Sequence, residues 1–104
     1  MPSFALFYHA EDNYAQRRKP YHAEHLRLVQ EARNRGDLLL AGALGEPIDG
    51  ALLVFRVPDR SIVEDFARND PYVRSDLITR WDIKPWAVVT DTAPAENDPA
   101  GERT

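Results

Sequence analysis

Hydrophobic residues along the chain gather in short continuous runs and in stretches with helical spacing, which predicts short strands separated by two helices. Residues 3–9 are a short, aromatic-rich run typical of a strand, in which successive side chains point to opposite faces. Residues 10–19 are polar and predict a loop. Over residues 20–35 apolar positions recur at helical spacing, and Gly36 follows where helices commonly end.

The middle and the end of the chain predict three further strands. Residues 37–44 and 51–57 are apolar runs of strand length. The segment GEPIDG between them has the proline and the Asp-Gly pair of a turn, so we expect a hairpin. Residues 78–90 predict a last strand or pair of strands. Pro85 has no backbone N–H for sheet pairing, which indicates an edge, a bulge or a bend at that point.

A second helix is predicted over residues 58–70. Ser61 and Glu64 have the spacing of a capping box at its start, and Pro71 blocks its continuation. Beyond the last strand, residues 91–104 are rich in proline, alanine and charged residues, which is typical of a flexible C-terminal tail.

The predicted order is β-α-β-β-α-β, the ferredoxin-like pattern of the α+β class. It forms one antiparallel sheet with both helices on a single face, within one domain of residues 1–90. The strands carry apolar residues at both alternations, for example Leu52 and Val54 as well as Leu53 and Phe55. A single chain would leave one of these sets exposed to water, so we expect a homodimer that buries the second sheet face.

Composition narrows the class of protein. The 104 residues suit one domain, and a formal net charge of −4 with acids and bases interspersed argues against a nucleic-acid partner. The chain has no cysteine, which excludes disulfides, thiolate catalysis and cysteine-ligated zinc. The segment MPSFALFYHAED has no basic region and only a short apolar run. We therefore expect neither a signal peptide nor a membrane span, and a cytoplasmic location.

Four segments in a fixed order resemble the YciI-like (YCII-related) family. They are HLRLVQEARNRGDLLLAGAL, DGALLVF, FARNDPYVRSDL and the closing W-x-I-K-P-W. The resemblance covers roughly residues 4–90. It implies the dimeric α/β barrel fold of the α+β class, which is related to muconolactone isomerases and small monooxygenases. One characterised branch of this family resembles a dehydrochlorinase that acts on a chlorinated hydroxyquinol.

The resemblance also implies a candidate active site formed by a histidine of the first helix and the aspartate of the Asp-Pro-Tyr segment, here His25 and Asp70. His25 lies on the apolar stripe of the first helix. There it is either a hydrogen-bonded core residue or a general acid–base, a role that suits imidazole. Asp70 either caps the turn that starts at Pro71, or orients His25 or a substrate hydroxyl. Whether the two side chains meet depends on how residues 70–77 fold back.

Three further side chains are candidate substrate-binding residues. Tyr72 would line the pocket with its phenol, unless it is simply packed. His22 lies at the rim, one helical turn before His25, and Arg18, in a basic run before the helix, would meet an anionic substrate. His9, His22 and His25 have no known zinc-motif spacing, so we expect no metal site, and no motif indicates a cofactor.

Two hypotheses of different classes follow. The first is a small, cofactor-independent enzyme that transfers protons on a small cyclic oxygenated substrate, as an isomerase or an eliminating lyase. His25 would be the acid–base and Asp70 its orienter. The second is a non-catalytic dimer that binds a small metabolite or assists a partner enzyme, because the chain has no nucleophile constellation. A third hypothesis, an oxygen-using or haem-dependent monooxygenase, is supported only by analogy with other proteins of this fold.

Overall fold

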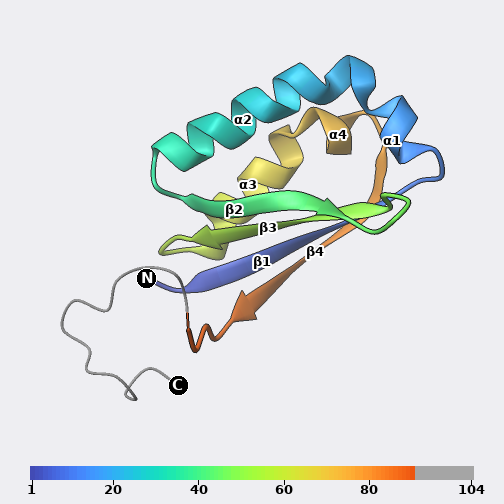
Figure 1. Ribbon diagram of the computed structural model, residues 1–104. Helices are drawn as coiled ribbons and strands as arrows, with labels where there is room; N and C mark the ends of the chain where they lie inside the picture. Colours follow the sequence, from blue (N-terminus) through green and yellow to red (C-terminus); the bar gives the residue numbers. More distant parts are fainter. Residues whose placement is uncertain (91–104) are drawn as a thin grey trace.

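The computed structural model describes residues 1–90 and shows one antiparallel sheet with helices on a single face (Figure 1). In spatial order β2-β3-β1-β4, its strands are β1 Ser3–Ala10, β2 Leu38–Leu44, β3 Gly50–Arg56 and β4 Ile78–Trp86. This arrangement confirms the predicted ferredoxin-like α+β fold. Pro85 lies in β4, an edge strand, as its missing N–H indicates. The predicted tail lies outside the described residues.

The helices all pack on the side of the sheet shown uppermost in Figure 1. They are α1 Tyr14–Arg17, the 3-10 helix η1 Lys19–Tyr21, α2 His22–Asn34, α3 Arg60–Asn69 and α4 Pro71–Arg74. None of the helices within residues 1–90 is both long and apolar enough to cross a lipid bilayer.

The prediction of a loop over residues 10–19 was wrong in part, because α1 and the start of η1 lie there. A helix of four residues is only about one turn long, so it leaves no hydrophobic repeat in the sequence. Tyr14 is buried and anchors this segment to the rest of the domain. The polar residues around it are exposed, which explains why the segment reads as a loop.

The ends of the two longer helices follow local chemistry. Gly36 adopts a φ of +84° just after α2, a left-handed conformation that favours glycine, as predicted. The capping box predicted for α3 was wrong: Asp59 is the N-cap, and its carboxylate accepts a hydrogen bond from the Ser61 N–H at 3.3 Å. Aspartate and serine are both good caps, and with only one residue between them the sequence pattern pointed to the wrong one.

The hydrophobic core lies between the sheet and the helices. Leu6 on β1 pairs with Leu53 on β3 and with Ile83 on β4, and all three side chains are buried. The alternate positions face away from the helices. Among them is Leu40 on β2, which pairs with Val54 and is 68% exposed. The sheet therefore has an apolar outer face, as the double alternation predicts.

Candidate functional site

Asp70 is a fully buried carboxylate at the junction of α3 and α4, with an exposed fraction of 0%. The following proline favours the extended backbone seen at Asp70, with φ −72° and ψ 124°, and this ends α3. The same residue caps α4, because its Oδ1 accepts a hydrogen bond from the Tyr72 N–H at 3.0 Å. The predicted cap is confirmed. One such hydrogen bond offsets only a small part of the free energy that it costs to bury a charged carboxylate.

Two further donors satisfy the Asp70 carboxylate. The Tyr8 hydroxyl, on the central strand β1, donates to Oδ2 at 2.8 Å. His25 Nδ1 lies 2.8 Å from Oδ2 and 3.0 Å from Oδ1. An ionised carboxylate only accepts hydrogen bonds, so the proton of this contact belongs to His25 Nδ1. In the neutral imidazole, Nε2 is then unprotonated and able to accept a proton.

His25 is held in place from two sides within the same chain. It comes from the first turn of α2, and its side chain is only 14% exposed. Its ring lies flat on the ring of Tyr72, with centroids 4.0 Å apart and an interplanar angle of 13°. Segment 70–77 therefore folds back far enough for the two predicted residues to meet. Within the described residues, His25 Nε2 has no hydrogen-bond partner.

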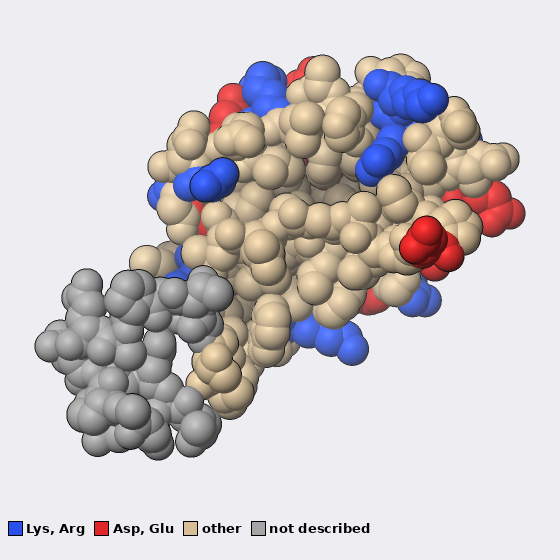
Figure 2. Space-filling view, in the orientation of Figure 1, with Lys and Arg blue, Asp and Glu red and all other residues tan. Residues whose placement is uncertain are grey.

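A cavity of about 180 Å³ lies beside this pair, between α2 and the strands β2 and β3. Figure 2 shows a hollow between α2 and β2, surrounded mostly by uncharged side chains and with basic groups toward α1. All predicted site residues except Asp70 line the cavity. Its lining is Tyr14, Arg18, His22, His25, Leu26, Val29, Ala41, Gly42, Ala43, Ala51, Leu53 and Tyr72.

Arg18 and His22 supply the polar groups of the cavity beyond His25. Arg18 follows α1 and is half-buried, and its guanidinium carbon lies 5.6 Å from the centroid of the Tyr14 ring. No carboxylate within residues 1–90 forms an ion pair with it. His22 is exposed, and its Nδ1 lies 2.7 Å from the Tyr72 hydroxyl oxygen. A cation without a carboxylate partner beside an apolar cavity suits an anionic ligand.

The buried tyrosines stay neutral. Burial raises the pKa of Tyr8 well above its usual value, and the neighbouring Asp70 charge adds to this. Burial is also the main cause that raises the pKa of Tyr72 to about 12. The pKa of Tyr14 is raised by burial too, although nearby Arg18 offsets part of this effect. Tyr8 therefore keeps the proton with which it binds Asp70.

This tyrosine chemistry predicts a loss of stability in alkali. An unfolded Tyr72 releases its proton near pH 10, whereas the folded residue holds it to about pH 12. Its contribution is thus complete below pH 10 and is lost as the pH rises toward 12. Urea unfolding across this range should show a shallower decline for Tyr72→Phe than for wild type. Parallel declines would contradict the assignment.

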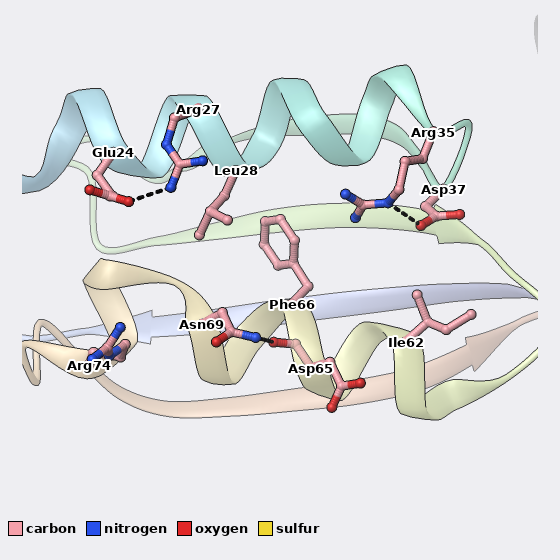
Figure 3. Close-up of a pocket in the computed structure, with 10 residues that line it drawn as sticks. All are labelled: Glu24, Arg27, Leu28, Arg35, Asp37, Ile62, Asp65, Phe66, Asn69 and Arg74. Atoms are coloured by element: carbon pink, nitrogen blue, oxygen red, sulfur yellow. Dashed lines mark hydrogen bonds and ion pairs between the residues drawn. The ribbon is translucent and has the colours of Figure 1, made fainter.

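A larger hollow of about 520 Å³ lies between α2 and α3 and has fewer side chains that could act in catalysis (Figure 3). Leu28 and Phe66 point toward each other within it. Its rim carries exposed ion pairs such as Arg35–Asp37, at 3.0 Å, and contacts of this kind contribute little. No histidine lines it. We therefore assign the candidate site to the smaller cavity, where a buried carboxylate and a histidine meet.

Two residues of the site, Tyr8 and Tyr14, were not predicted from the sequence. Tyr8 carried a usable signal: it sits on the inner face of the first strand, and a buried tyrosine hydroxyl usually finds a partner. Tyr14 gave no such signal, because its helix was not predicted. Within residues 1–90, no three histidine, aspartate or glutamate side chains are grouped so that they could hold a metal ion.

Comparisons with known proteins match the chain to one family and one fold. The family model described as YCII-related domain matches residues 1–87. Among solved structures, the chain is similar to 5-chloro-2-hydroxyhydroquinone dehydrochlorinase from Burkholderia phenoliruptrix AC1100, solved in complex with 2,5-dihydroxybenzoquinone. The TM-score is 0.70 and the identity 17%, with 82% of this chain and 93% of that chain covered. At this identity the likeness shows the fold alone. The curated proteins gave no match.

Proposed function

Because this chain belongs to the YCII-related family, we propose that it is a small cofactor-independent enzyme whose catalytic residue His25 is oriented by Asp70. It would transfer protons on a small cyclic oxygenated compound, in an isomerisation or an elimination. One observation carries the proposal: His25 Nδ1 lies 2.8 Å from a fully buried carboxylate beside a cavity. A cytoplasmic location is part of the same proposal, and a sequence without cysteine is compatible with it.

The geometry favours His25 as a base. Asp70 holds the proton on Nδ1, so Nε2 keeps its lone pair for a substrate proton, and the carboxylate stabilises the imidazolium that forms. The negative charge that develops on the substrate would face the cation of Arg18. An apolar cavity of about 150 Å³ holds a benzene ring, so the cavity of about 180 Å³ has room for one small ring.

The solved structure with the same fold suggests which compounds to test first. Its name gives a dehydrochlorinase of a chlorinated hydroxyhydroquinone, and its ligand is a dihydroxybenzoquinone. Both are single oxygenated rings, which matches the size of the cavity described above. We propose hydroxylated quinones and hydroquinones, with and without a chlorine substituent, as the leading substrate class. Small lactones complete the panel as test substrates for an isomerase activity.

Replacing His25 tests this proposal directly. Wild type should turn over a member of that panel, and His25→Ala should lower the rate by about 10²- to 10⁴-fold, the usual contribution of general acid–base catalysis. Gln30→Ala, on the exposed side of α2, is the matched control and should keep full activity. Equal turnover by wild type and His25→Ala would remove His25 from the mechanism.

A second candidate function is non-catalytic binding of a small metabolite, and one observation favours it. Asp70 already links β1, α2 and α4 through its three donors, so the network also has a structural role. A binding protein would bind members of the same panel and form no product. Calorimetric binding without turnover, for wild type and Gln30→Ala alike, would favour this candidate over the enzyme.

We further propose that the protein is a homodimer joined through the outer face of its sheet. Leu40 is 68% exposed and Trp86 is 45% exposed, both on strands of this sheet. Light scattering after size exclusion should give twice the chain mass of 11.8 kDa. Leu40→Lys should shift the population toward the monomer because it puts a charge into the interface. Ala23→Lys on exposed α2 should not, and a monomeric wild type would contradict the proposal.

A further inference from the structure

The second histidine of the cavity has a partner of its own. His22 Nδ1 lies 2.7 Å from the Tyr72 hydroxyl oxygen, and both residues line the cavity with His25. Tyr72 thus contacts both histidines, His25 through the face of its ring and His22 through its hydroxyl. Whether His22 donates or accepts in this bond decides what its other nitrogen can do.

The chemistry of the pair favours tyrosine as the donor. A phenol is a stronger donor than a neutral imidazole N–H, and an imidazole nitrogen is a stronger acceptor than a phenol oxygen. The Tyr72 ring is buried, and within residues 1–90 its hydroxyl has no acceptor except His22 Nδ1. If His22 donated, no side chain within residues 1–90 would accept the phenolic proton, which is the costlier arrangement.

The two histidines then carry opposite hydrogen-bonding polarity. Asp70 accepts from His25 Nδ1, so the free Nε2 of His25 is a base. With Tyr72 as the donor to His22 Nδ1, at 2.7 Å, the free Nε2 of neutral His22 would carry a hydrogen. Arg18 lines the same cavity and has no carboxylate partner in the described part of the chain.

We propose that His22, set by Tyr72 as an Nε2–H donor, is a second catalytic residue that binds the oxyanion of the substrate while His25 removes the proton. This inference rests on the proposed function and names its substrate class: a carbonyl compound whose acidic C–H or O–H is conjugated to the carbonyl. The substrate proton moves to His25 Nε2, and the electron pair it leaves moves onto the carbonyl oxygen. His22 donates a hydrogen bond to that oxygen and keeps its own proton, and Arg18 balances the negative charge.

Nitrogen-15 NMR of the two imidazoles tests the assignment without any substrate. At about pH 8, above the usual titration range of imidazole, His22 should be protonated on Nε2 and His25 on Nδ1. Tyr72→Phe should release His22 into a mixture of tautomers and leave His25 unchanged, which also reports an intact fold. A hydrogen on His22 Nδ1 in wild type would overturn the inference.

Ligand binding tests the oxyanion role. 4-Nitrophenolate, an aromatic oxyanion, should bind wild type at least tenfold more tightly than nitrobenzene, which lacks the oxygen. His22→Leu should remove most of this preference, and His22→Gln, whose amide N–H still donates, should restore part of it. His22 is exposed at the start of α2, so these changes leave the core untouched. Equal binding of the two probes, or binding of neither, would contradict the inference.

The two proposals fail separately. If His25→Ala keeps full turnover, the proposed function fails whatever the tautomer of His22. If His22 carries its hydrogen on Nδ1, this inference fails even where His25 proves to be the base.

Discussion

Asp70→Asn is expected to lower kcat by about 10³- to 10⁴-fold while the protein stays folded, the size of loss seen when an orienting carboxylate becomes an amide. The asparagine oxygen can replace Oδ1 and still accept from the Tyr72 N–H, which leaves the NH₂ group in the place of Oδ2, beside the Tyr8 hydroxyl and His25. This NH₂ group would donate to His25 Nδ1. The ring must then place its own hydrogen on Nε2, and the base is lost. Steady-state kinetics on an active substrate measure the effect.

Tyr8→Phe is the matched control for this change. It removes a different hydrogen bond to the same carboxylate and leaves the His25 contact in place. We expect a rate loss of less than about tenfold, together with a stability loss of about 1 kcal/mol for the missing hydrogen bond. If Tyr8→Phe and Asp70→Asn lowered kcat equally, packing rather than the tautomer of His25 would explain the loss.

Asp70→Ala is expected to have the largest effect on stability, about 2–5 kcal/mol in the free energy of unfolding. It leaves the Tyr8 hydroxyl and the Tyr72 N–H without their acceptor, and each orphaned buried donor costs about 1–3 kcal/mol. It also removes the cap of α4. Urea unfolding monitored by circular dichroism gives the difference, with Asp70→Asn expected to lose clearly less.

A double variant separates the orphaned hydroxyl from the rest of this cost. In the Asp70→Ala background the Tyr8 hydroxyl has lost its acceptor, so Tyr8→Phe should cost less than in wild type, or even restore stability. A coupling of about 1 kcal/mol or more between the two changes is expected. Strictly additive losses would show that the Tyr8–Asp70 hydrogen bond contributes nothing.

The fold was largely readable from the sequence because its elements have clear patterns. The strands are short apolar runs bounded by turn residues, and the long helix α2 repeats at helical spacing up to a glycine end. The predictions that were wrong concern a very short helix and the exact residue at which another helix begins. The helix α1 is about one turn long, and the start of α3 depended on which of two neighbouring cap residues engaged the backbone.

The identities of the two main site residues could be predicted from the sequence, but their contact could not. Residue types and the family resemblance pointed to His25 and Asp70, but the distance between them depends on a backward fold of α4 that no local pattern encodes. The two roles predicted for Asp70, as the cap of the turn at Pro71 and as the orienter of His25, turn out to be compatible. One oxygen of its carboxylate accepts from the Tyr72 N–H as a cap, and the other accepts from Tyr8. Both lie within reach of His25 Nδ1.

We expect His25 and Asp70 to act as one unit, and the kcat of the double variant His25→Ala/Asp70→Asn is the sharpest measurement of this coupling. Residues that act together are not additive, because without its imidazole the carboxylate has nothing to orient. The double variant should therefore be no slower than His25→Ala alone. A kcat lower by the full product of the two single losses would show that His25 and Asp70 have independent roles.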